Sequence, residues 1–158
     1  RRLFGSDIDP EAIKWCQQNL HWAGGFEVNP HQAPSPFEDA KFDLIYGISV
    51  FTHLPEDLQH SWLQDLQRIC KSGGFLVLTF HGATHHEKLQ GPLREKLNAH
   101  GFAYSGAARG TTAGLPDFYQ TSFHTTDYVR TVWGEYFEVI DIKADGIGVQ
   151  DAVLLRKA

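Results

Sequence analysis

The stretch RLFGSDIDPEAIKWCQQNL (residues 2–20) joins a short strand-like run to a helical pattern. Asp9 is a typical N-cap residue, and Pro10 suits the first helical position, where its missing N–H has no consequence. Asp7 stands two residues earlier, at the carboxyl end of the strand-like run. The two acids therefore have separate predicted roles, Asp9 as a helix cap and Asp7 as a carboxylate beyond a strand end.

Strand and helix patterns alternate along the rest of the chain. Strands are expected at 26–29, 42–49 and 75–80, helices at 55–74, 87–99 and 125–137, and an antiparallel hairpin at 137–146 and 150–157. The runs 42–49 and 75–80 are almost continuously apolar, which is typical of strands buried on both faces. The order predicts an α/β fold of one domain, 1–158, with a Rossmann-like, mainly parallel sheet and a C-terminal antiparallel hairpin.

Composition restricts the class of partner. The net charge is −5 and the basic residues are scattered, which argues against a nucleic-acid or anionic membrane surface. No apolar run reaches the roughly 18 residues of a membrane helix, and no signal-peptide pattern opens the chain. Cys16 and Cys70 are the two cysteines, and both are expected to be buried free thiols. We therefore expect a cytoplasmic protein.

Ligands of open α/β sheets bind beyond the carboxyl ends of the strands, and Asp7 lies at such a position. A carboxylate there can accept both hydroxyls of a ribose, although a solvated turn acid is the simpler alternative. The segments GSDIDPEAIKWCQQNL and FDLIYGISVFTHLPEDLQHSWLQDLQRICKSGGFLVLTFHG, together with the terminal hairpin, resemble a class I S-adenosylmethionine-dependent methyltransferase over nearly the whole chain.

The resemblance implies a cofactor site made of residues at strand ends. Asp7 would bind the ribose hydroxyls, and Ile8 would pack on the adenine ring. Asn29 stands where the family often has an acid that reads the adenine amino group, and its carbonyl oxygen can still accept that hydrogen bond. Ser49 and Val50 would line the methionine part of S-adenosylmethionine.

One element of the family pattern has no counterpart in this sequence. The family's first strand and its glycine-rich loop are not found, so we expect an N-terminally truncated domain with a gap in its sheet. The second strand of the family could close against the fourth, or a partner chain, as in a homo-oligomer, could fill the gap. For this chain alone we expect weak or absent S-adenosylmethionine affinity, and a micromolar dissociation constant would contradict that expectation.

Three histidines are candidates for a general base. His53 and His81 follow predicted strands, and His124 lies in the segment 101–125, which we expect to be mostly irregular and to form a lid or substrate segment. Phe118 and Tyr119 in this segment are the candidate substrate contacts. The run His-His-Glu at 85–87 lacks the spacing of a zinc-binding helix, so no metal site is expected.

The acceptor of the methyl group is expected to be a small molecule, but no residue identifies it. Two alternatives stay open. A dinucleotide-dependent oxidoreductase fragment would also end its second strand in a ribose-binding acid. A non-catalytic Rossmann-like module would have kept the sheet and lost the cofactor.

Overall fold

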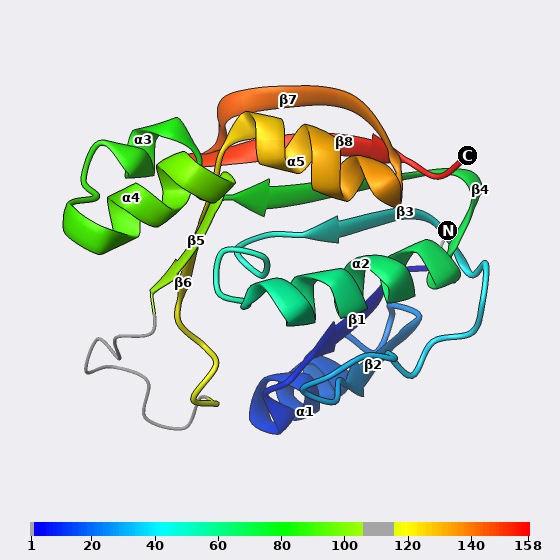
Figure 1. Cartoon of the computed structure of the whole chain (residues 1–158). Helices are drawn as coiled ribbons and strands as arrows, with labels where there is room; N and C mark the ends of the chain where they lie inside the picture. Colours follow the sequence, from blue (N-terminus) through cyan, green and yellow to red (C-terminus); the bar gives the residue numbers. More distant parts are fainter. Residues whose placement is uncertain (1, 106–115) are drawn as a thin grey trace.

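The computed structural model describes residues 2–105 and 116–158 (Figure 1). The strands of these residues form three sheets, with orders β1-β2, β3-β4-β8-β7 and β5-β6. No helix within the described ranges is long and apolar enough to cross a membrane. The α/β fold class predicted from the alternation of patterns is confirmed.

The N-terminal unit consists of β1 (Phe4–Asp7), α1 (Pro10–Asn19) and β2 (Gly25–Val28). The predicted cap is present, since Asp9 Oδ1 accepts the backbone N–H groups of Glu11 at 2.9 Å and Ala12 at 3.3 Å. The helix returns the chain so that β2 pairs in parallel with β1. The opening stretch thus folds locally as its pattern predicts.

The largest sheet contains β3 (Phe42–Gly47), β4 (Cys70–Phe80), β7 (Glu138–Ile147) and β8 (Gln150–Arg156). β3 and β4 are parallel, whereas β8 runs antiparallel to both β4 and β7. The predicted terminal hairpin is therefore confirmed, and its second strand lies inside the sheet.

Helices α2 (Glu56–Ile69) and α5 (Thr126–Val132), with the 3₁₀ turn η1 (Trp133–Glu135), pack on one face of this sheet. The core between them includes Leu63, Leu76, Val129, Trp133 and Leu155, each of which is fully buried. This packing fixes α2, α5 and η1 on the large sheet and so positions the carboxyl end of β3.

The other face of β3 is exposed, so the prediction that residues 42–49 are buried on both faces is wrong. Leu44 and Tyr46 are 60% and 62% exposed, and Phe75, the cross-strand partner of Leu44, is 40% exposed. Side chains alternate between the faces of a strand, and only the face that carries Ile45 packs on the helices. The apolar residues Leu44 and Tyr46 therefore lie on a face of β3 that no other described residues cover.

Two element boundaries also differ from the prediction. The expected helix 55–74 ends at Ile69, and β4 starts at Cys70 instead of Phe75. Cys70 pairs with Phe42, and the backbone of 73–74 bonds to Lys157, so tertiary pairing extends the strand through the two glycines. The helix expected at 87–99 begins later, as α4 (Gly91–His100), and a separate short helix, α3 (Ala83–His86), precedes it.

The segment expected to be mostly irregular, 101–125, contains a hairpin. β5 (Phe102–Ser105) pairs antiparallel with β6 (Thr121–His124), so the expectation of irregular structure is wrong for these residues. Residues 106–115 of the expected lid lie outside the described residues.

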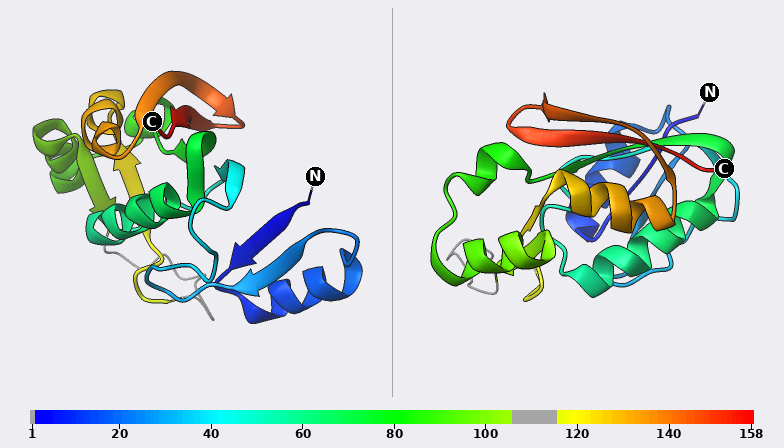
Figure 2. Two further views of the ribbon diagram at one scale, coloured as in Figure 1. Left: turned by 90° about the vertical axis from the view of Figure 1, so that its right-hand side faces the viewer. Right: turned by 45° about the horizontal axis from the view of Figure 1, so that its top comes forward.

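The N-terminal unit stands apart from the large sheet (Figure 2, left). Among the described residues β1 pairs only with β2 and β3 only with β4, so one edge of each strand is free. Near the start of β1 the two parts touch through Phe4, whose ring packs edge-on against Phe37 and Phe42 with Lys41 Nζ 4.7 Å from its centroid. Among the described residues, β1 and β3 are therefore separated by the gap that was expected from the sequence.

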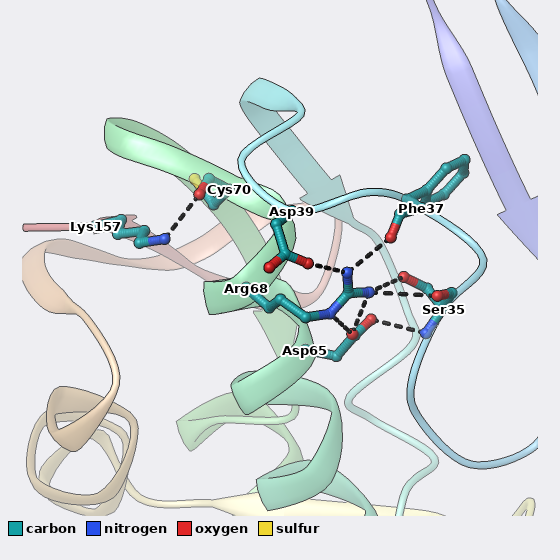
Figure 3. A network of polar contacts seen from close by, with 7 residues as sticks. All are labelled: Ser35, Phe37, Asp39, Asp65, Arg68, Cys70 and Lys157. Atoms are coloured by element: carbon teal, nitrogen blue, oxygen red, sulfur yellow. Dashed lines mark hydrogen bonds and ion pairs between the residues drawn. The ribbon is translucent and has the colours of Figure 1, made fainter.

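A network of hydrogen bonds and ion pairs centred on Arg68 holds residues 35–39 of the loop between β2 and β3 (Figure 3). Arg68 on α2 donates to the carbonyl of Phe37 and to Asp39, both at 2.7 Å, and pairs with the buried Asp65 at 2.6 Å. Asp65 Oδ2 in turn accepts the backbone N–H of Ser35 at 2.9 Å. These contacts raise the pKa of Arg68, chiefly through the bond to Asp39.

Arg68→Lys should loosen this loop, because an ammonium cannot reproduce the planar fork that contacts four groups at once. We expect hydrogen exchange of the Ser35 amide to accelerate about tenfold or more, as the loss of one charge-assisted bond implies. Arg156→Lys is the matched control, since Arg156 pairs with Glu138 at 4.0 Å and lies 5.9 Å from the Phe75 ring centroid, both within the large sheet. Equal Ser35 exchange in both variants would contradict the role assigned to Arg68.

Candidate functional site

A cavity of about 740 Å³ lies between the free edges of β1 and β3. Its walls include every residue of 2–9 on one side and of 44–51 on the other. Trp62 and Leu66 of α2, both half-buried, also contribute to it. The volume falls within the range of small-molecule and cofactor sites.

The structure brings all predicted cofactor and substrate residues to this one cavity. They come from four separate segments and comprise Asp7, Ile8, Asn29, Ser49, Val50, Phe118 and Tyr119. They converge because the carboxyl ends of β1, β2 and β3 all open toward the same part of the cavity.

The carboxylate of Asp7 is exposed at the end of β1. Its Oδ1 accepts the backbone N–H of Asp9 at 2.9 Å. This local bond, within the turn between β1 and α1, fixes the orientation of the Asp7 side chain. Ile8 follows and is half-buried in the same wall. An acceptor group beside an apolar surface suits a ligand that carries hydroxyls next to a flat ring.

Asn29 supplies an unpaired acceptor. Its backbone N–H donates to the carbonyl of Asp7 at 2.8 Å, which holds the ends of β2 and β1 together. Its Oδ1 is buried and has no partner among the described residues. Because an unpaired buried carbonyl oxygen is costly, this atom is suited to accept a hydrogen bond from a ligand amino group.

Ser49 turns the chain after β3 in a left-handed conformation, with φ of 60°. Its N–H donates to Thr79 Oγ1 at 2.8 Å, and Thr79 is fully buried in β4. Val50, the next residue, is 47% exposed and lies along the cavity.

Phe118 and Tyr119 lie just before β6 and contact residues that follow β2 and β3. Phe118 packs edge-on against His31, with ring centroids 5.6 Å apart, and Tyr119 stacks on His53 at 4.2 Å. Burial, together with the negative charge on Asp7, raises the pKa of Tyr119. His31, two residues after Asn29, was missed by the sequence analysis, since only the fold shows that it meets Phe118.

None of the three candidate base histidines belongs to the cavity wall. His124 is itself part of β6, and the other two lie beside this strand: His53 Nδ1 donates to the Gln120 carbonyl at 2.7 Å, and His81 Nδ1 donates to the Ser122 carbonyl at 3.1 Å. His53 is half-buried behind Tyr119, and its Nδ1–H bond leaves Nε2 as the acceptor atom of the neutral ring.

The other two histidines are more deeply buried. Burial and the neighbouring His85 lower the pKa of His81 to about 4. His124 has no exposed surface, its Nε2 bonds to Gln59 Oε1 at 2.9 Å, and burial lowers its pKa to about 3. The structure therefore places His124 in the core, out of reach of a ligand in the cavity.

Comparison with known proteins agrees with this geometry. Residues 1–78 match the family model described as a methyltransferase domain. Together with the relatives and solved structures below, this match supports a class I methyltransferase domain. The match favours this family over the dinucleotide-dependent oxidoreductase alternative.

A curated relative is the probable phthiotriol/phenolphthiotriol dimycocerosates methyltransferase 2 of Mycobacterium ulcerans (strain Agy99), 30% identical over 71 residues. That alignment covers 45% of this chain, and the chain spans only 27% of the relative's length.

Solved methyltransferases share the fold over nearly the whole chain. A S-adenosylmethionine-dependent methyltransferase from Methanosarcina mazei gives a TM-score of 0.60 at 20% identity, covering 98% of this chain and 81% of its own. The 1,6-didemethyltoxoflavin-N1-methyltransferase of Burkholderia thailandensis gives 0.65 at 13% identity, covering 100% and 62%. The Rossmann-like fold of the methyltransferase domain is therefore shown.

The low pKa of His81 predicts a pH dependence of stability. Because its folded pKa lies below its ordinary value of 6.5, the neutral ring stabilises the fold above that value, and this contribution is lost as pH falls from 6.5 toward 4. We expect the free energy of unfolding, measured by urea titration, to fall more steeply over this window in the wild type than in His81→Gln, by up to about 1.4 kcal/mol per pH unit.

His100→Gln is the control for that measurement, because His100 is an exposed histidine at the end of α4. It should keep the wild-type slope. An unchanged slope in His81→Gln would show that His81 is not held neutral by the fold.

Proposed function

We propose that this domain binds S-adenosylmethionine in the cavity between β1 and β3 and serves methyl transfer to a small-molecule acceptor. The observation that carries the proposal is the Oδ1 of Asn29, which has no partner among the residues that the structure describes and shares one cavity with the exposed carboxylate of Asp7. Because the chain spans 27% of its curated relative, the reaction of the whole protein is part of the same proposal.

Each cofactor residue has a role that its position supports. Asp7 accepts hydrogen bonds from the ribose hydroxyls, Asn29 Oδ1 accepts one from the adenine amino group, and Ile8 packs on the ring. Ser49 and Val50 line the part of the cavity beyond β3, on the methionine side. When bound, S-adenosylmethionine supplies the reactive methyl group, and the chain contributes binding and alignment.

The acceptor side of the proposal rests on Phe118 and Tyr119, whose rings offer a flat apolar surface over the cavity. The Burkholderia relative was crystallised with the small molecule 1,6-didemethyltoxoflavin and S-adenosylhomocysteine, which agrees with a small-molecule acceptor in this fold. We assign the 101–125 segment of this single domain, 1–158, to the acceptor.

His53 is the base that we carry forward. It is half-buried rather than buried, and its Nδ1–H donates to the Gln120 carbonyl, so Nε2 is the ring nitrogen that we assign to accept the proton. His81 is more deeply buried and is held neutral, so its role is to anchor β6 beside the site.

Titration with S-adenosylhomocysteine, followed by NMR chemical shifts, tests the cofactor assignment and detects weak affinity. Saturable shifts are expected at Asp7, Ile8 and Asn29. Asp7→Asn should weaken the affinity about tenfold or more, because a charged acceptor is lost.

The matched control is Asp141→Asn, which alters another exposed carboxylate that accepts a local backbone N–H, that of Ile142. It should leave the affinity unchanged. Equal affinities of Asp7→Asn and the wild type would refute ribose binding by Asp7, and no saturable shifts at all would favour the non-catalytic module.

We also propose that the domain has no nucleic-acid partner and that it is cytoplasmic. The net charge of −5 supports a domain without a nucleic-acid surface. The free thiols of Cys16 and Cys70 are consistent with a cytoplasmic location.

The gap between β1 and β3 also supports the proposed homo-oligomer. A free strand edge with exposed apolar side chains is a template for pairing with another chain. Within the described chain every strand already has a partner on at least one edge. A folded second copy can therefore pair with one side of the gap, but cannot bridge both sides.

Light scattering across a concentration series tests this association. Leu44→Lys should shift the equilibrium toward monomer, because it places a charge beside the free edge of β3. Val149→Lys is matched in exposure, at 61% against 60% for Leu44, and lies at the β7–β8 turn. A monomeric wild type, or equal effects of both variants, would refute this interface.

A further inference from the structure

A contact from the C-terminal hairpin reaches the turn after β3. Gln150, the first residue of β8, donates from Nε2 to Ser49 Oγ at 3.0 Å, although the two residues are 101 positions apart. Ser49 Oγ also lies 3.3 Å from Thr52 Oγ1. The same serine therefore has side-chain contacts in two directions, besides its backbone bond to Thr79.

The backbone of Ser49 explains why such contacts matter. Its φ of 60° lies in the left-handed region, which residues with a Cβ seldom adopt. Ala40 and Asp145 are the other non-glycine residues with positive φ in the described ranges, and neither lines the cavity. Strained backbone persists only where the surroundings over-determine it, and it concentrates at functional sites.

The amide of Gln150 is itself poorly satisfied. Its Oε1 is buried and finds no partner within the part of the chain that the structure describes. Burial of an unpaired carbonyl oxygen lowers the free energy of unfolding, so this oxygen gives no reason for a glutamine at position 150. What the side chain gains at this position is the bond to Ser49.

We infer that Gln150 is a positioning residue of the candidate site, which holds Ser49 in its left-handed conformation and so sets the course of Ser49 and Val50 along the cavity wall. The inference rests on the proposed function for its link to the cofactor. It assigns the C-terminal hairpin a part in a site otherwise built from strand ends and from the Phe118–Tyr119 segment.

The first measurement is the backbone φ of Ser49, obtained from the three-bond HN–Hα coupling and the Cα and Cβ chemical shifts. The wild type should show positive φ, and Gln150→Ala should shift Ser49 toward negative φ. Gln67→Ala is the matched control, because Gln67 is also half-buried and donates a single bond from Nε2, to the carbonyl of Tyr136. Retention of positive φ in Gln150→Ala would overturn the inference.

The second measurement is a rescue. Glycine adopts positive φ without strain, so Ser49→Gly removes the need for the tether. Gln150→Ala should weaken S-adenosylhomocysteine binding by about fivefold, as the strain of one left-handed residue implies. The double variant Ser49→Gly/Gln150→Ala should then bind within about twofold of Ser49→Gly alone.

The two measurements separate the two proposals. A wild type that does not bind S-adenosylhomocysteine counts against the proposed function, whereas the φ of Ser49 in Gln150→Ala still decides the role of Gln150. If Gln150→Ala changes φ but binds as the wild type does, or if the double variant stays as weak as Gln150→Ala, the link between Gln150 and the site is refuted.

Discussion

One guanidinium group holds the loop that joins the N-terminal unit to the large sheet. Because no ladder hydrogen bond joins β1 to β3 among the described residues, the position of β1 depends on this loop and on the packing of Phe4 against Phe37 and Phe42. Arg68 binds that loop at the carbonyls of Ser35 and Phe37 and at Asp39, and Asp65 binds it at the Ser35 amide. Arg68 and Asp65 belong to α2, which packs on the large sheet, so the ion pair connects the two walls of the cavity. A buried carboxylate such as Asp65 tolerates this place only while it is paired.

Local signals predicted the fold where neighbours in the sequence decide it. The Asp9 cap and the β7–β8 hairpin depend on residues close together in the chain, and both were foreseen. The prediction that β3 is buried on both faces was wrong. An apolar run shows that both faces of a strand could be buried, but it does not show whether another element covers each face. The start of β4 was also missed, since Cys70 becomes a strand residue only through its distant partner Phe42.

The candidate site divides in the same way. Residues that follow strands, such as Asp7 and Asn29, were found from the sequence, because the carboxyl ends of parallel strands meet at one edge. Gln150 and His31 were not found, since each acts through a contact that only the folded chain creates. The contacts of the candidate base histidines also come from the folded chain, since His81 Nδ1 donates to the Ser122 carbonyl of β6.

The place of β8 in the sheet has a consequence for biosynthesis. β8 is the last strand of the chain, yet it lies between β4 and β7, so neither of these strands has its full set of neighbours until residues 150–156 have been synthesised. The β1–α1–β2 unit, in contrast, is built from contacts within residues 4–28 and can form while the chain is still growing. During translation the β1–α1–β2 side of the cavity can therefore form before the large sheet that carries the other side is complete.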